Sequence, residues 1–292
     1  MQTKQRYYGK AVASFLLVLL MMPLGHALMI IMEHTMSAQA MHRAAFAMGA
    51  AGLVAGIVGI FAKGDTRQTL WGLFGGMLFW TGWVEFLFMY FANRFGTQPM
   101  LDPQTGEVVT RPEYLIMPAS FGFWMLIMIL YVFRCNTGCN FIRWWQRLLP
   151  AAVRDKAQAR PMARHSSLVT FAELVMIMWG SYLLLMFCYD PEFVGDSHPL
   201  TFVVGTCCLA GAVYVFRLMA RTSSTGASIR LAIPAVILFW TPVEILGRLD
   251  FFREIWIEPA RYKAPMSAIL TTFIVLALYL WFRRIDRRNQ RA

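Results

Sequence analysis

Apolar residues run along this chain in long stretches that are separated by short polar segments. An α-helix needs roughly 20 apolar residues to cross the ~30 Å hydrocarbon core of a bilayer. Eight stretches meet that length, and we expect each of them to be a membrane-spanning helix. They are residues 11–33, 44–62, 70–93, 114–134, 167–189, 199–219, 228–249 and 264–283. The pattern therefore predicts an all-α integral membrane protein with eight transmembrane helices.

Composition agrees with this interpretation. Of the 292 residues, 58% are hydrophobic and only 15% are charged, whereas soluble domains carry about 25% charged residues. The first stretch is too long for the core of a signal peptide, and no small-residue cleavage site follows it, so we expect it to be retained as a helix.

The basic residues predict how the helices are oriented. If the N-terminus lies in the cytoplasm, eight spans return the C-terminus to the same side, and 20 of the 27 Lys and Arg residues become cytoplasmic. Cytoplasmic loops of membrane proteins carry such an excess of basic residues. We therefore expect an N-in/C-in protein of the inner (plasma) membrane of a bacterium. The net charge of +11 reflects this topology and contact with anionic lipid, and no nucleic-acid partner is expected.

The two halves of the chain share residues in the same order, which indicates an internal duplication. An offset of 156 overlays spans one and two on spans five and six, and an offset of 160 overlays Phe79-Trp80-Thr81 on Phe239-Trp240-Thr241. Each half has four spans, so the repeats would run parallel, as two four-helix bundles packed side by side. We assign residues 1–134 and 167–292 to the repeats. Residues 135–166 form a basic cytoplasmic linker in which residues 142–153 resemble an amphipathic interfacial helix.

Each repeat places a glutamate behind the same Phe-Trp-Thr triplet. Thr81 and Glu85 are four residues apart, and Thr241 and Glu244 are three apart, so a helix keeps both pairs on one face. Ionisable groups inside a membrane helix usually face the bundle interior. Two interpretations stay open: the acids hold helices together, or they form a site for protons, a cation or a polar substrate. Arg248, four residues after Glu244, is expected to pair with it and make that half the more structural one.

Most intramembrane ionisable residues fall near the outer ends of their spans, which predicts an outward-facing polar site. Imidazole and carboxylate ligands suit zinc, iron or copper(II), and methionine thioethers suit copper. A metal site in the first half is one hypothesis, against the alternative that the methionines only pack. Its candidate ligands are His26, Glu33, His34, His42 and Glu85. Quinone binding beside an outer glutamate or histidine is a further hypothesis.

No phosphate loop, dinucleotide fingerprint, nucleophile elbow or HExxH pattern occurs in the sequence, so whether the chain is an enzyme stays open. Three functions are consistent with the sequence. The favoured one is an integral membrane subunit of a respiratory, electron-transfer or transport complex, with other membrane or periplasmic subunits as partners. Its outward polar site would bind a metal, a proton or a quinone. The first alternative is a secondary transporter or channel that uses Glu85 and Glu244 as coupling carboxylates. The second is an intramembrane metal-dependent enzyme built on His26, His42 and Glu85.

Overall fold

The fold is almost entirely helical in the computed structural model, which describes residues 2–101, 106, 108–134, 139–158, 165–249 and 251–282. Among these residues, eight helical runs are long and apolar enough to cross a membrane. They are Tyr7–Thr35, Ala38–Phe61, Asp65–Arg94, Pro112–Phe133, Ser166–Tyr189, Pro199–Arg221, Thr225–Arg248 and Lys263–Phe282. Each overlaps one expected span, so the prediction of a multi-pass, all-α membrane protein is confirmed.

Several spans consist of more than one helical element. The spans are built from α1 (Gln2–Thr35), α2 (Ala38–Val58) with η1 (Gly59–Phe61), α3 (Asp65–Phe79) with η2 (Trp80–Glu85) and α4 (Phe86–Arg94), α5 (Pro112–Ile116) with η3 (Met117–Ser120) and α6 (Phe121–Arg134), α9 (Ser166–Tyr189), α10 (Pro199–Arg221), α11 (Thr225–Arg248) and α12 (Lys263–Phe282). The shorter elements are an antiparallel hairpin of β1 (Met100–Leu101) and β2 (Val108–Thr110), and the helices α7 (Asn140–Arg147) and α8 (Ala151–Gln158).

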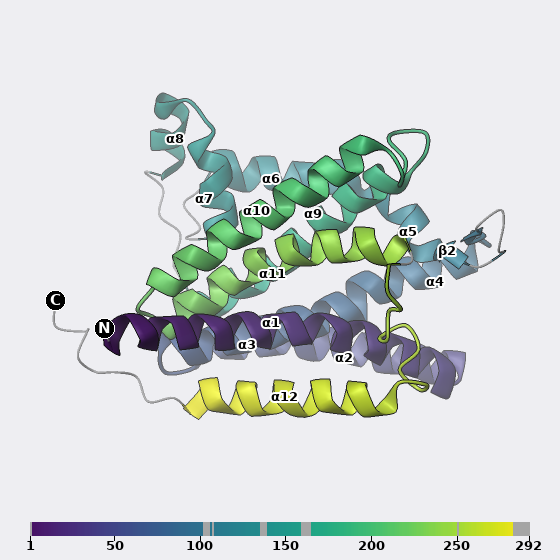
Figure 1. Cartoon of the computed structure of the whole chain (residues 1–292), viewed down its shortest axis with the longest axis horizontal. Helices are drawn as coiled ribbons and strands as arrows, with labels where there is room; N and C mark the ends of the chain where they lie inside the picture. Colours follow the sequence, from purple (N-terminus) through teal and green to yellow (C-terminus); the bar gives the residue numbers. More distant parts are fainter. Residues whose placement is uncertain are drawn as a thin grey trace.

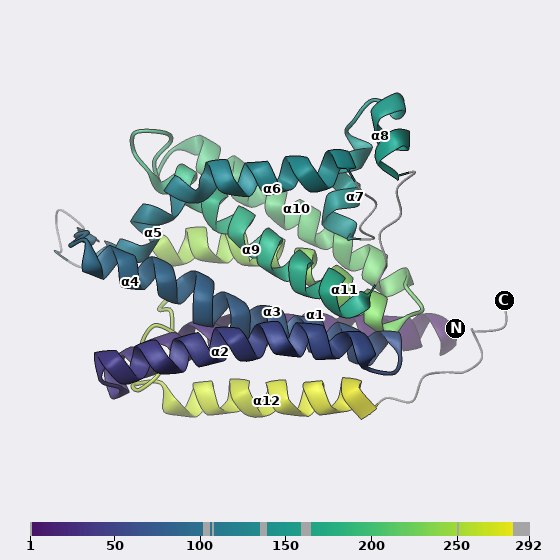
Figure 2. The same ribbon diagram turned by 180° about the vertical axis from the view of Figure 1, so that it is seen from behind.

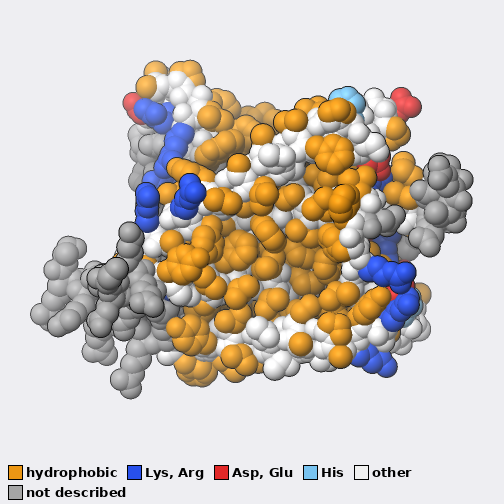
Figure 3. All heavy atoms as spheres, viewed as in Figure 1, with side chains coloured by type: hydrophobic (Ala, Val, Ile, Leu, Met, Phe, Trp, Pro, Cys, Tyr) orange, Lys and Arg blue, Asp and Glu red, His pale blue; other side chains and the backbone are white. Residues whose placement is uncertain are grey.

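The helices lie roughly along one direction, so the molecule has two ends (Figure 1). We call one the basic end: α1 begins there, α12 ends there, and α7 and α8 lie beside it. We call the other the hairpin end, because it carries β1 and β2. Between the two ends the visible surface is mostly hydrophobic, and the charged side chains gather toward the ends (Figure 3). This is the surface expected of a protein that crosses a bilayer.

Helices α1, α3, α9 and α11 form the centre of the molecule, and the halves of the chain are interleaved there (Figures 1 and 2). Helix α1 packs mainly on α11, α12 and α10, which all belong to the second half. Helix α9 packs on α3, α2 and the α5–η3–α6 run of the first half. The first helix of each half thus packs extensively against the other half, so the two halves are interleaved.

The segment η2 is a π-helix, so the third span holds one extra residue in the "WTGWVE" stretch. Gly82 lets this wider turn approach α2. A Cβ atom at Gly82 would lie 2.4 Å from the Gly49 nitrogen and 2.6 Å from the Ala45 carbonyl oxygen, both of which are backbone atoms. The matching stretch of the second half, "WTPVE", lies within the α-helix α11, which runs unbroken through Pro234 and Pro242. Although proline often breaks a helix, α11 stays continuous at Pro242.

The basic linker contains two short helices instead of the expected single helix over residues 142–153. Helix α7 ends at Arg147, and α8 begins just after Pro150, because proline lacks the backbone N–H that a continuing helix would need. Trp144 and Trp145 are exposed on α7, at 53% and 36% of their surface, as expected for aromatic side chains at headgroup depth. Of residues 135–138 and 159–164 the structure describes nothing.

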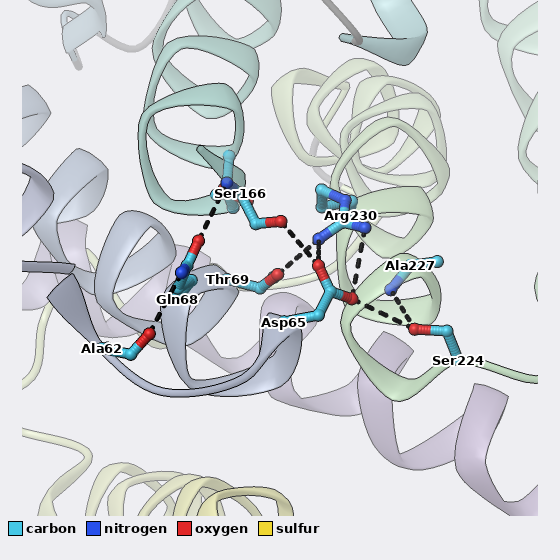
Figure 4. Close-up of polar contacts among 9 residues, drawn as sticks. Ala62, Asp65, Gln68, Thr69, Ser166, Ser224, Ala227 and Arg230 are labelled. Atoms are coloured by element: carbon cyan, nitrogen blue, oxygen red, sulfur yellow. Dashed lines mark hydrogen bonds and ion pairs between the residues drawn. The ribbon is translucent and has the colours of Figure 1, made fainter. Parts of the chain in front are cut away.

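A polar network joins three of the central helices at the basic end (Figure 4). Arg230 of α11 donates to both carboxylate oxygens of Asp65 at the start of α3, at 2.8 and 3.3 Å, and to the Thr69 hydroxyl at 2.6 Å. The Ser166 hydroxyl of α9 donates to Asp65 at 2.6 Å, and that of Ser224 donates to it at 3.1 Å. One carboxylate thus fixes the relative positions of α3, α9 and α11.

Candidate functional site

An ionisable pair well inside the spans joins His26 to Glu85. His26 is carried by α1, and Glu85 ends the π-helical segment η2. The His26 Nδ1 atom lies 3.5 Å from a Glu85 carboxylate oxygen, and their side chains are 20% and 11% exposed. The sequence placed these residues at one depth, and the structure brings them into contact.

The residues before Glu85 pack the site against α9. The Trp80 ring is almost fully buried and stacks on Tyr182 of α9, with ring centres 5.6 Å apart and planes 10° from parallel. The Thr81 hydroxyl is buried without a hydrogen-bond partner. A buried polar atom without a partner costs free energy, so Thr81 is a place where a bound water or ligand would be stabilised.

Glu244 approaches the same site from α11. Its carboxylate accepts a 2.5 Å hydrogen bond from the Trp240 indole, and it lies close enough to His26 for the two charges to interact. Glu85 and Glu244 also lie within electrostatic range of Tyr182. One acid from each half therefore converges on one imidazole. The Thr241 hydroxyl, by contrast, already has a hydrogen-bond partner, because it donates to the Ile237 carbonyl at 3.0 Å.

Two tyrosines that the sequence interpretation missed complete the cluster. Tyr114 of α5 stacks on Tyr182, with ring centres 5.5 Å apart, and Glu85 and Glu244 lie within electrostatic range of it. The signal for Tyr182 was present in the sequence, since it occupies the position of His26 in the second half. Tyr114 had no such signal, because only the fold brings α5 beside α9.

Arg248 does not pair with Glu244 as expected. Its Nε donates to Asp196 at 2.6 Å, and its Nη1 donates to the Thr110 hydroxyl at 2.7 Å and to the Val109 carbonyl at 3.1 Å. The guanidinium also lies 4.3 Å from the Tyr189 ring centre. The long arginine side chain reaches toward the hairpin end, whereas Glu244 is bonded to Trp240 one turn back along α11. The four-residue spacing that predicted the Glu244–Arg248 pair takes no account of partners outside the helix.

The remaining metal candidates do not join His26 and Glu85. Glu33 lies 3.6 Å from Arg111 in an ion pair, which Arg111 extends to Glu113 at 4.0 Å. The His34 Nδ1 contacts the Ile30 carbonyl of its own helix at 2.8 Å. His42 packs edge-on against Tyr90, with ring centres 4.9 Å apart. Within the described part of the chain, no group of three or more His, Cys, Asp or Glu side chains could hold a metal ion.

An apolar groove of about 460 Å³ flanks η2. Its walls include Phe79, Trp83 and Phe88 of the third span and Trp179 of α9. The indole N–H groups of Trp83 and Trp179 are already bonded to the Phe46 carbonyl and the Ser120 hydroxyl. The groove could hold an apolar chain or ring by stacking, but it leaves no polar donor for a quinone carbonyl, so a quinone headgroup does not fit it.

Comparison of this chain with protein-family models, with curated proteins and with solved structures finds no match.

Proposed function

We propose that this protein is an integral membrane subunit of a larger electron-transfer or transport assembly, and that His26, Glu85 and Glu244 form its proton-binding site. The observation that carries the proposal is the 3.5 Å contact between His26 and Glu85 inside the spans, with Glu244 in electrostatic range. Intramembrane ionisable residues that face the bundle interior commonly serve in proton relays. Imidazole changes its charge near neutral pH, so this group can take up and release a proton under cellular conditions.

A proton fits this site better than a metal ion. Of the five metal candidates, only His26 and Glu85 contact one another, and the other three are engaged by Arg111, a helix carbonyl and an aromatic ring. An imidazole and two carboxylates can share a proton without the convergent geometry that a zinc or copper ion demands. For the same reason, the hypothesis of an intramembrane metal-dependent enzyme lacks the set of metal ligands that it requires.

The proposed orientation is N-in/C-in, with the basic end in the cytoplasm and the cluster in the outer half of the membrane. The distribution of Lys and Arg supports it. Reporter fusions test this directly. Alkaline phosphatase, which folds only outside the cytoplasm, should be active when inserted between residues 191 and 198 and inactive when fused after residue 292. The reverse pattern would contradict the orientation.

The proposed parallel repeat is supported by the pattern of helix packing. When each span is exchanged for the one four places later, several of the main contacts map onto one another, although the contact of α9 with α11 has no comparable counterpart between α1 and α3. The pair α1–α11 corresponds to α9–α3, and α2–α3 corresponds to α10–α11. The contact of α1 with α12 likewise corresponds to that of α9 with the α5–η3–α6 run. Such a relation is expected of two copies related by an axis along the membrane normal.

Partner subunits are supported by apolar side chains outside the spans. Phe95, Phe193 and Phe251 lie in three separate connections at the hairpin end and are 75%, 67% and 74% exposed. Aromatic side chains are enriched in protein interfaces. A second membrane or periplasmic subunit that covers the hairpin end would bury them.

The proton-binding site is tested by pH-dependent infrared difference spectroscopy on the full chain in lipid nanodiscs. Wild-type protein should show a carboxyl signal that changes with pH. Glu85→Gln should remove that signal, and His26→Gln should shift the pH at which it appears. Glu192→Gln, in an exposed loop, is the matched control and should leave both features unchanged. Identical spectra for the wild type, Glu85→Gln and Glu244→Gln would refute the site.

The subunit assignment is tested by native electrophoresis of membranes solubilised in mild detergent. The chain should migrate in a complex with a second protein at fixed stoichiometry. Replacing Phe95, Phe193 and Phe251 together by serine should release it, while Phe282→Ser, at the basic end of α12, should not. A monomer without any stoichiometric partner would overturn this part of the proposal and leave the proton site standing.

A secondary transporter or channel is the second candidate, because Glu85 of the first half contacts His26 and Glu244 of the second half lies in electrostatic range of it. In transporters built from two repeats, the ion or substrate site lies at the interface of the repeats, and the repeats move around it during alternating access. The two candidates differ in net transport. Purified wild-type chain in liposomes loaded with a pH-sensitive dye should then move protons without any partner, and Glu85→Gln and Glu244→Gln should each abolish the flux. An absence of flux in wild-type liposomes would reject this candidate and favour the subunit.

A further inference from the structure

A second site lies at the opposite end of the molecule from His26 and Glu85. A cavity of about 330 Å³ opens at the basic end between α7, α9, α10 and α11. This volume falls in the roughly 300–1,000 Å³ range of pockets that bind small molecules. Its lining residues are Asn140, Arg143, Ser166, Val169, Thr222, Ala227, Arg230 and Leu231.

The two charged residues in this lining are both arginines. Arg143 of α7 makes no hydrogen bond or ion pair with any described residue. Arg230 is held by Asp65 and Thr69 through its two terminal nitrogens, and its Nε keeps no partner within the described residues. The Arg230 side chain is 17% exposed. One arginine is thus fixed in place by the network in Figure 4, and the other is free to engage a ligand.

Besides the two arginines, a neutral hydrogen-bond donor and a nearby lysine also favour a negatively charged ligand in the cavity. The side chain of Asn140 forms no bond to a described residue, so its amide can donate. Lys10 of α1 is buried and donates to the carbonyls of Thr222 and Ser223 at 2.5 and 2.6 Å, directly at the rim. The acids nearby do not line the cavity: Asp65 is neutralised by Arg230, and Glu173 is fully buried behind α7. The lining therefore favours an anion.

The position of α7 indicates the depth of the cavity. Trp144 and Trp145, which follow Arg143 directly, are exposed on this helix, and tryptophan side chains settle at the headgroup level of a bilayer. Arg143 therefore lies where lipid phosphates and the phosphate groups of cytoplasmic solutes can both reach it. Arginine binds phosphate oxygens through two parallel N–H donors.

From Arg143, which has no partner among the described residues, the fixed Arg230 and the cavity that both line, we propose that this site binds a phosphate-bearing anion. Arg143 and Asn140 contact the phosphate from α7, and the free Nε of Arg230 contacts it from α11. The ligand reaches the cavity either as the headgroup of an anionic lipid or as a soluble phosphate. The site is independent of the proton-binding cluster. Occupancy would tie the linker helix α7 to the central helices α9 and α11.

Native mass spectrometry of the delipidated full chain in detergent tests the proposal. The probes are dioctanoyl phosphatidylglycerol, inorganic phosphate and dioctanoylglycerol, which lacks a phosphate. Arg143→Gln is the test variant. Arg147→Gln is the matched control, because it removes the same charge from the same helix, is exposed and does not line the cavity. Losing a hydrogen bond to a charged group should weaken binding roughly 10- to 100-fold.

Binding of phosphatidylglycerol that Arg143→Gln weakens and Arg147→Gln does not would support the site with a lipid as its ligand. The same dependence with inorganic phosphate would support it with a soluble source. Equal binding by wild type and Arg143→Gln, equal loss in both variants, or equal binding of dioctanoylglycerol would overturn it. Circular dichroism checks that each variant folds, and if Arg143→Gln does not, Asn140→Ala replaces it, with the same expected loss.

Discussion

Arg248 holds three segments together at the hairpin end through one guanidinium group. It donates to Asp196 in the loop after α9, to Thr110 and Val109 of β2, and it covers the Tyr189 ring. Its side chain is 9% exposed. Planar donors of this kind suit several acceptors at once, which a lysine ammonium cannot match in geometry. Arg248 therefore acts as a structural residue, while Glu244 in the same helix belongs to the polar cluster.

Replacing Arg248 by methionine should lower the free energy of unfolding by about 2 kcal/mol, because it leaves the buried Thr110 hydroxyl and the half-buried Asp196 carboxylate without their charged donor. The free energy of unfolding of Arg248→Lys should lie between those of the wild type and Arg248→Met, since lysine keeps the positive charge but lacks the planar set of N–H donors of arginine. Unfolding in mixed detergent micelles, followed by circular dichroism, measures both. Arg253→Met, at an exposed position, is the control. A loss at Arg253 equal to that at Arg248 would contradict this role.

The contact between His26 and Glu85 should appear as a coupling free energy. His26→Ala and Glu85→Ala each remove one partner, so the double variant should be more stable than the sum of the single effects predicts. Contacting polar pairs couple by about 0.5–3 kcal/mol. The same micelle unfolding assay supplies the four values of the cycle. The same double-mutant cycle for His26 and Glu33, which pairs with Arg111 instead, should give a coupling free energy near zero. Equal coupling in both cycles would show that the measured energy is not specific to the 3.5 Å contact.

At the scale of elements, η2 explains why the two Phe-Trp-Thr segments differ in length. A π-helical turn accommodates one extra residue while the helix on either side keeps its face. Thr81 and Glu85 therefore stay on the inner side of the third span, just as Thr241 and Glu244 stay close on the regular helix α11. The extra residue of the first segment thus leaves its acid on the inner face.

Deletion of Trp83 should convert η2 to a regular α-helix and yield a folded protein that retains the His26–Glu85 contact. The variant should lose some stability, because Trp83 donates to the Phe46 carbonyl and packs against Gly49. Deletion of Phe88 from the regular helix α4 is the control. It should rotate the rest of α4 by about 100° and prevent folding. Size-exclusion profiles and helical content of the two proteins provide the comparison. Equal behaviour of both deletions would contradict this account of η2.

Sequence reasoning succeeded for elements whose signal is local. Runs of apolar residues located all eight spans, and the depth of Glu85 and His26 anticipated their meeting. It failed for pairs whose partners are determined by loop conformation and by the packing of the helices. The carboxylate of Asp196, which binds Arg248, lies 52 residues away, and Asp65 and Arg230 are 165 residues apart. The π-helix left no trace in composition, because only the comparison of the two Phe-Trp-Thr segments exposes its extra residue.

For the whole molecule, interleaving determines how stability is distributed. Because α1 packs on α10, α11 and α12, and α9 packs on α2 and α3, each half of the chain buries its first helix in the other. The Asp65–Arg230 pair links the halves again at the basic end. Neither half holds a complete core. The chain should therefore unfold as one cooperative unit, and not as two independent domains.

Fragments 1–162 and 163–292, expressed together, should assemble into a stable complex, whereas each fragment alone should be degraded. Affinity purification through a tag on one fragment, with recovery of the other, measures this. Gly72→Ala should abolish assembly, because a Cβ atom there would lie 2.1 Å from the Ser167 carbonyl oxygen across the fragment boundary. Gly122→Ala, at a position with open space around it, is the control and should assemble normally. A fragment that is stable and protease-resistant alone would show that the halves are separate domains, and assembly unaffected by Gly72→Ala would show that α3 and α9 do not form the contact that joins them.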